Sequence, residues 1–236
     1  KDFSQSVLFT TFFMSNFLFM FEGNYFDFNT QYKPLLHTWS LSIEMQFYIL
    51  YPLLLNLIIK STKKISLVLF FLMTLCFCLN YAISITNPKI AFYLLPSRAW
   101  ELLAGSLIYT FSALNSKKQN TLLQYSKEKF HNFLSSVGFL LIIFSLFFYD
   151  EKINPQIIFN LITVMGTVLI IVYTRKKNFL YNFLSIRYLT GLGLISYSLY
   201  LWHYPIFNIA KYLSIESLEI VNYINLIIVS LAGVRS

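Results

Sequence analysis

The sequence predicts an all-α fold, a polytopic membrane bundle of about eight transmembrane helices. Of the 236 residues, 57% are hydrophobic and only 12% are charged, which is too apolar for the surface of a soluble domain. The apolar residues form long runs without strand-like alternation, and only 7 Gly and 6 Pro interrupt them. This pattern favours helices over a membrane β-barrel.

Eight apolar runs approach the roughly 20 residues that a helix needs to cross a bilayer. Polar stretches such as 60–64, 115–132 and 175–178 separate the runs, and none of them is long enough for a soluble domain. We therefore expect one membrane domain over residues 1–236. The predicted spans are residues 4–21, 39–59, 65–86, 98–114, 133–149, 157–174, 189–210 and 219–234.

The basic residues predict how these spans are oriented. If alternate loops lie on opposite sides of the membrane, thirteen of the 18 Lys and Arg residues fall on one side and five on the other. Cytoplasmic loops carry the excess of basic residues, so we expect the richer side, with both ends of the chain, in the cytoplasm. The net charge of +8 thus indicates membrane topology rather than nucleic-acid binding.

Charged groups inside the spans are candidate functional residues, because a charge at the bilayer centre costs about 2.5–3.5 kcal/mol or more. Glu44 lies roughly one and a half turns below the outer end of the second span. Arg98 and Glu101 fall in the first turn of the fourth span, and His203 lies about two turns below the outer end of the seventh. We expect all four groups at a similar depth, in the outer half of the membrane.

Helical spacing places two of these residues on polar stripes that are lined by aromatic rings. The stripes comprise Ser40, Glu44, Phe47, Tyr48 and Tyr51 on the second span, and Ser196, Tyr200, His203 and Phe207 on the seventh. Pro52 and Pro205 lie inside the same spans and leave the carbonyls of Tyr48 and Leu201 without their helical donors. Freed carbonyls and kinks are common where helices surround a cavity.

Each candidate residue also has a purely structural interpretation. Arg98 and Glu101 stand three residues apart, so they can form an ion pair at a helix end as readily as they contact a substrate. His203 lies between aromatic neighbours and can belong to an interfacial aromatic belt. We favour a functional role for His203. For Glu44 we favour a functional or structural-network role over a bystander role, because no basic residue lies at helical spacing from it in its own span.

Three segments carry distinctive motifs: HTWSLSIEMQFY at residues 37–48 with YPLLL at 51–55, PSRAWELLAG at 96–105, and ISYSLYLWHYP at 195–205. These segments resemble the acyltransferase 3 family, bacterial membrane O-acyltransferases of the type that acetylates the O-antigen of lipopolysaccharide. The corresponding family signatures are HTWSLSVEEQFY…WPLLL, P-x-R-x-WELLLG and ISYSLYLWHWP. One departure is Met45, which stands where the family has a second glutamate.

The resemblance implies transfer of an acyl group, commonly acetyl, from a thioester donor such as acetyl-CoA to a carbohydrate hydroxyl. It implies no bound cofactor and no metal, and its partners are the lipid bilayer and a carbohydrate or lipid-linked glycan acceptor. The reaction needs a base and polar groups that stabilise an oxyanion. We assign Glu44 and His203 to catalysis. We assign substrate contacts to His37, Ser40, Tyr48, Arg98, Glu101, Ser196 and Tyr200.

Family members commonly have ten spans. The first span carries a histidine that is the expected catalytic base, and a basic RxxR pattern follows it. These features are absent here, so the resemblance implies an excerpt that begins near the third family span, lacks the closing motif and is inactive alone. Glu44 would then orient the upstream histidine. A transporter or flippase of lipid-linked glycans is an alternative, because intramembrane Glu, Arg and His also mark transport pathways. An inactive fragment is another alternative.

Overall fold

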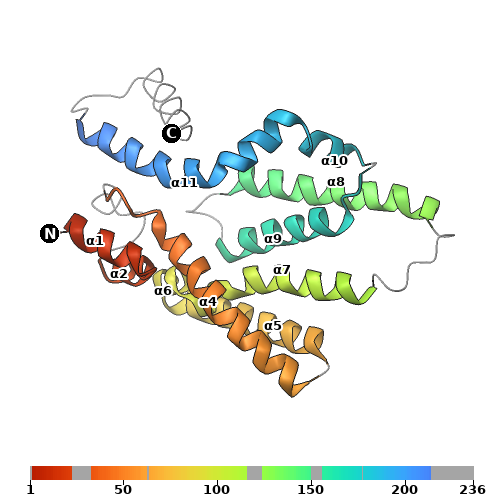
Figure 1. The fold of residues 1–236 in the computed structure, drawn as a ribbon, viewed down its shortest axis with the longest axis horizontal. Helices are drawn as coiled ribbons and strands as arrows, with labels where there is room; N and C mark the ends of the chain where they lie inside the picture. Colours follow the sequence, from red (N-terminus) through yellow and green to blue (C-terminus); the bar gives the residue numbers. More distant parts are fainter. Residues whose placement is uncertain are drawn as a thin grey trace. The chain divides into compact units, whose positions relative to one another are not determined.

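The computed structural model describes residues 2–22, 33–62, 64–115, 124–149, 156–176 and 178–213. Over these ranges the secondary structure consists of α-helices and contains no β-strand, which confirms the all-α prediction for this part of the chain (Figure 1). The chain divides into two compact units. The first unit comprises residues 1–52, 87–95 and 187–236, and the second comprises residues 53–86 and 96–186.

Four helices within the described ranges are long and apolar enough to cross a membrane, so the protein is a helical membrane protein. They are α4 (Thr38–Ser61), α5 (Ile65–Thr86), α8 (Gln124–Phe148) and α9 (Gln156–Tyr173), and they match the predicted spans 39–59, 65–86, 133–149 and 157–174. The predicted spans 98–114 and 189–210 lie in α7 (Leu95–Asn115) and α11 (Arg187–Leu213), which are long enough but more polar. The predicted span 219–234 lies outside the described residues.

The prediction of one continuous helix over residues 4–21 was wrong. The structure has two shorter helices there, α1 (Asp2–Thr11) and α2 (Ser15–Glu22). Phe13 has a left-handed backbone with φ of 55°, its amide donates to the Thr10 carbonyl at 3.1 Å, and the Met14 amide donates to the Phe9 carbonyl at 2.8 Å. These two bonds form a Schellman motif, which ends a helix while satisfying its last carbonyls. Hydropathy does not reveal such a break, because apolar residues predominate on both sides of it.

The left-handed conformation of Phe13 leads to a prediction about this break. Glycine adopts that conformation without steric cost, whereas a β-branched side chain clashes with its own backbone there. Phe13→Gly is therefore expected to keep the abundance of the full-length protein, and Phe13→Ile is expected to lower both abundance and melting temperature. Both can be measured by fluorescence-detected gel filtration of detergent extracts. Equal melting temperatures for the Ile variant and the wild type would contradict the break at Phe13.

The core of the first unit lies where α2, α6 (Pro88–Tyr93) and the segment before α4 meet. Phe19, Leu36 and Tyr93 are 0%, 0% and 1% exposed, and Trp39 and Tyr204 pack against them. Asn87 is the N-cap of α6, and its side-chain oxygen accepts from the Ile90 amide at 3.2 Å. Pro88 follows in the first turn. This short helix places Tyr93 in the core.

The second unit is built around two helices, α8 and α9, which pack side by side as an antiparallel pair (Figure 1). A Cβ atom added to Gly138 would lie 2.7 Å from the Gly166 carbonyl oxygen, and one added to Gly166 would lie 2.7 Å from that of Gly138. The Thr163 hydroxyl donates to Ser145 Oγ at 2.7 Å across the same interface. Small residues and interhelical hydroxyl bonds of this kind hold helices together in lipid. The short helix α10 (Phe179–Leu184) follows α9.

Candidate active site

His37 is the central residue of the candidate site in the first unit. It stands one residue before α4 and is 5% exposed, and both ring nitrogens are buried without a hydrogen bond to any described residue. Burial, and then the charge of His203, lower the pKa of His37 from 6.5 to about 4, and the Leu201 backbone opposes this shift weakly. The imidazole is therefore neutral at neutral pH.

Three rings from α11 surround His37. The ring centroids of Tyr200 and Tyr204 each lie 5.1 Å from that of His37, and the centroid of His203 lies 5.5 Å away with its plane turned by 68°. Tyr200, His203 and Tyr204 share one side of α11 because they are spaced by three and four residues. The fold thus brings a segment near residue 37 and a segment near residue 200 to one place.

His203 has a tautomer that its surroundings determine. Its Nδ1 lies 3.1 Å from the Leu199 carbonyl oxygen, and a carbonyl can only accept a hydrogen bond, so Nδ1 carries the proton. In the neutral ring Nε2 then holds a lone pair. No residue in the described ranges bonds to Nε2, and unlike the nitrogens of His37 it is not shut off from solvent. The lone pair of His203 Nε2 is therefore available to accept a proton.

Ser40 and Tyr200 connect α4 to α11 within the same cluster. The Tyr200 hydroxyl donates to the His37 backbone carbonyl, and Ser40 Oγ lies 2.7 Å from Tyr200 Oη. Because the Tyr200 proton points at the carbonyl, Ser40 is the donor of the second bond. These bonds hold the backbone of His37 against α11. The structure therefore brings together four residues that the sequence predicted: His37, Ser40, Tyr200 and His203.

Three other predicted residues lie outside this cluster in the described part of the first unit. Glu44 is exposed on α4 and has no hydrogen bond or ion pair with a described residue. Tyr48 is 57% exposed, and its ring contacts Phe47 of its own helix at 6.4 Å. Ser196 is exposed and donates to the Gly193 carbonyl of its own helix at 2.8 Å. Their assignment to the site remains a prediction.

Arg98 and Glu101 belong to the second unit and bind each other there. Arg98 Nη1 donates to Glu101 Oε1 at 2.8 Å, and Asn160 Nδ2 of α9 lies 3.4 Å from the same oxygen. The ion pair that the spacing of three residues allowed is therefore present. The Asn160 amide was not predicted, because it lies 59 residues away in sequence and has no helical spacing to Glu101. A substrate contact for this pair remains a prediction.

Within the described residues, no group of three or more His, Cys, Asp or Glu side chains is placed to hold a metal ion. The cluster instead offers one neutral buried imidazole, one imidazole with a free lone pair, and two hydroxyl groups. The lone pair of His203 Nε2 can accept a proton from a substrate hydroxyl, while the hydroxyl groups of Tyr200 and Ser40 hold the cluster together. Tyr204, which sequence reasoning passed over as a neighbour of His203, completes the aromatic wall.

The chain matches a known family over almost its entire length. The family described as "Acyltransferase domain" matches residues 3–234. A Bacillus subtilis (strain 168) protein, named with reservation as peptidoglycan O-acetyltransferase YrhL, is 33% identical over 205 residues, which are 83% of this chain and 32% of that protein. The Listeria monocytogenes peptidoglycan O-acetyltransferase OatA is 28% identical over 214 residues, 84% of this chain and 33% of that protein.

The Staphylococcus aureus (strain NCTC 8325) O-acetyltransferase OatA is 29% identical over 207 residues, which cover 83% of this chain and 33% of that protein. The chain thus spans about a third of the length of these three relatives. No solved structure matches it. The family match and the three sequence segments agree, and the chain belongs to the acyltransferase 3 family.

Proposed function

We propose that the full-length protein containing this chain is a membrane O-acetyltransferase that modifies a cell-envelope carbohydrate. The observation that carries the proposal is the cluster in which His203 presents a free Nε2 beside the buried ring of His37. Membership of the acyltransferase 3 family supports the same reaction class. The acyl donor in this proposal is a thioester, most simply acetyl-CoA from the cytosol.

The proposed reaction moves an acetyl group from sulfur to oxygen. A carbohydrate hydroxyl attacks the thioester carbonyl, its proton passes to a basic nitrogen, and a tetrahedral intermediate forms with charge on the carbonyl oxygen. Collapse of the intermediate breaks the C–S bond, and the proton then neutralises the departing thiolate. His203 accepts the proton, and the hydroxyl groups of Tyr200 and Ser40 hold α4 and α11 together around it.

Glu44, Tyr48 and Ser196 have roles in this proposal that depend on groups outside the described residues. Glu44 would orient a histidine of the upstream spans, as the family resemblance implies, and an exposed carboxylate in lipid needs such a partner. Tyr48 and Ser196 would contact the carbohydrate. The Arg98–Glu101 pair, with Asn160, would bind a polar group of the substrate.

Peptidoglycan is the acceptor that we propose. The printed names of the Bacillus subtilis and Listeria monocytogenes relatives state peptidoglycan, and the proposal carries that acceptor to this chain. An O-antigen or lipopolysaccharide acceptor, which the sequence resemblance suggested, is the alternative that the experiment below distinguishes. We also propose that the long apolar helices cross a bacterial inner membrane, with the loops that are richer in Lys and Arg in the cytoplasm.

The experiment that tests this function deletes the full-length gene and restores it on a plasmid. Base-labile acetate is then measured separately on purified peptidoglycan and on purified lipopolysaccharide or other envelope polysaccharide. We expect acetate on peptidoglycan to disappear with the gene and to return with the plasmid. Loss of acetate from another polysaccharide alone would replace the acceptor, and unchanged acetate on every polymer would refute the acetyltransferase function.

A further inference from the structure

A buried set of hydrogen bonds fixes the break between α1 and α2 against α4. The side chains of Ser15, Asn16 and Ser42 are at most 1% exposed. The Ser15 amide donates to Ser42 Oγ at 3.2 Å, and the two hydroxyl oxygens lie 2.7 Å apart. Polar groups buried in this way in a membrane protein remain only where partners satisfy them. The Ser42 hydroxyl therefore provides a hydrogen-bond partner for the amide and the hydroxyl of Ser15 in the first turn of α2.

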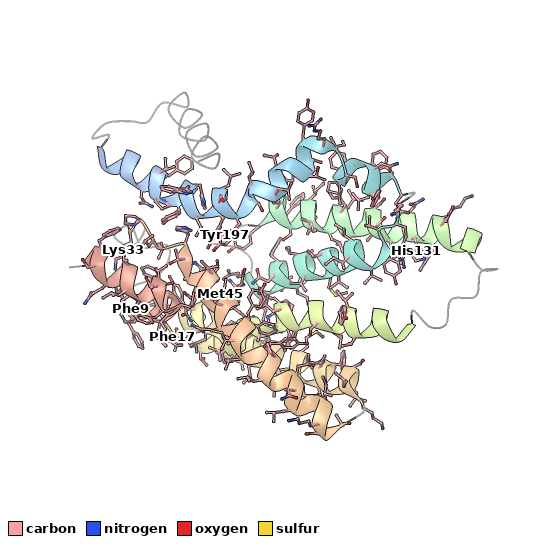
Figure 2. All side chains as sticks on the ribbon, in the orientation of Figure 1. Phe9, Phe17, Lys33, Met45, His131 and Tyr197 are labelled. Carbon is pink, nitrogen blue, oxygen red and sulfur yellow. The ribbon has the colours of Figure 1, made fainter. Side chains whose placement is uncertain are left out.

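Gln46 satisfies the backbone at the break itself. Its Nε2 atom donates to the carbonyl of Phe13 at 2.7 Å and to Oδ1 of Asn16 at 2.9 Å. The Phe13 carbonyl lies between two helices, so no helical donor is available to it. Figure 2 shows Phe9 on α1, Phe17 on α2 and Met45, the neighbour of Gln46, on α4.

These contacts come from one face of α4. Thr38, Ser42 and Gln46 are spaced by four residues and follow one another along the helix. Thr38 Oγ1 lies 3.1 Å from Thr10 Oγ1 and donates to Ser15 Oγ at 3.1 Å. Ser40, which bonds to Tyr200, lies two residues from both Thr38 and Ser42 and so projects from a different face. One helix thus contacts the α1–α2 break with one face and the His37 cluster with another.

A chain of contacts leads from Gln46 to His37. Asn16, which accepts from Gln46, donates through Nδ2 to the Tyr93 carbonyl at 3.0 Å. Tyr93 packs in the core with Leu36, the residue before His37, and with Phe19 of α2. Tyr204 packs against this core and also against the ring of His37. The wall around His37 therefore depends on where α2 and α6 lie.

We propose that Gln46 and Ser42 are positioning residues that hold α2 and α6 so that the His37 ring stays enclosed beside His203. The proposal concerns the local structure of the first unit and, for its effect on catalysis, rests on the proposed acetyltransferase function. Gln46 acts through Asn16 and Tyr93, and Ser42 acts through Ser15. Neither side chain contacts the reacting groups.

The test measures how well diethyl pyrocarbonate, which acylates accessible neutral imidazoles, reaches each histidine of the full-length protein in membranes. Peptide mass mapping then gives the modified fraction separately for His37, His131 and His203. In the wild type we expect His203 to react and His37 to be protected. In Gln46→Leu and in Ser42→Ala we expect modification of His37 to rise several-fold. Acetyl transfer is expected to fall roughly 10-fold to 100-fold, the cost of a misplaced catalytic group.

Two controls separate positioning from a general loss of structure. Met45→Leu changes the adjacent side chain of α4 with little change in volume, and it should leave His37 protected and activity unchanged. His131 lies in α8 of the second unit, so general unfolding would raise its modification, whereas lost positioning leaves it unchanged. Ser42→Ala is the milder substitution. If Gln46→Leu lowers the abundance of the protein, the test relies on Ser42→Ala instead.

Four results would overturn the proposal or separate it from the proposed function. Protection of His37 in both variants would overturn it, and so would equal rises at His37 and His131. Exposure of His37 with wild-type acetyl transfer would refute its effect on catalysis. A wild-type protein without acetyltransferase activity would refute the proposed function instead, while selective exposure of His37 in the variants would still support the positioning of the ring.

Discussion

Replacing His203 with glutamine in the full-length protein is expected to reduce acetyl transfer about 100-fold to 10,000-fold, the usual contribution of a general base. Glutamine retains a hydrogen-bonding side chain but has no basic nitrogen. The Leu199 carbonyl holds the proton on Nδ1 of His203, so the substitution removes the lone pair of Nε2. The rate is measured as acetate transferred to purified acceptor per unit of membrane-extracted enzyme.

Tyr197→Phe provides the matched control for His203→Gln. Tyr197 lies on α11 and is 55% exposed, so removing its hydroxyl should leave the rate within about twofold of the wild type because surface changes cost little. Its position on the helix is marked in Figure 2. If His203→Gln keeps the wild-type rate at normal abundance, the base lies elsewhere, and a histidine in the upstream spans becomes the candidate.

Gly138→Ala is expected to destabilise the α8–α9 pair by about 1–3 kcal/mol, the usual cost of an overpacked contact. The added Cβ would lie 2.7 Å from the Gly166 carbonyl oxygen and 2.8 Å from Leu169 Cβ, so one helix must move. Backbone atoms form much of this contact, and they cannot rotate away as a flexible side chain does. The melting temperature of the purified protein should therefore fall.

Gly105→Ala tests the same substitution without the contact. An added Cβ on Gly105 meets no atom within 4 Å, and this residue also lies inside a helix, α7. Alanine favours helix over glycine by about 0.5–1 kcal/mol, so Gly105→Ala should leave the melting temperature unchanged or raise it. Equal effects at the two positions would show that α8 and α9 do not approach each other as closely as Gly138 and Gly166 indicate.

The sequence predicted the long apolar helices well because length and hydropathy alone define them. Four of the predicted spans correspond to helices that can cross a membrane. The break at Phe13 was missed because α1 ends there through backbone hydrogen bonds, which any residue type can form. The six-residue helix α6 was missed because it is far shorter than a span, although the Asn87-Pro88 pair is a recognisable helix start.

Helical spacing predicted part of the site, but not the partners of each residue. It grouped Ser40 with Glu44 and Tyr200 with His203, because periodicity shows which residues share a helix face. It could not show that Ser40 bonds to Tyr200 of α11 while Glu44, one turn later, has no hydrogen bond or ion pair with a described residue. The second polar stripe of α4, Thr38, Ser42 and Gln46, has the same spacing and would have been found by searching every face of that helix.

The break between α1 and α2 also has a consequence for the order in which the protein is made. The side chains that satisfy it, Ser42 as an acceptor and Gln46 as a donor, follow Ser15 and Phe13 by 27 and 33 residues, so the ribosome adds them later. Until α4 is made, the Ser15 amide and the Phe13 carbonyl lack these partners, and unpaired backbone groups are costly in lipid. We therefore expect the α1–α2 segment to become stable in the bilayer only after α4 has been synthesised.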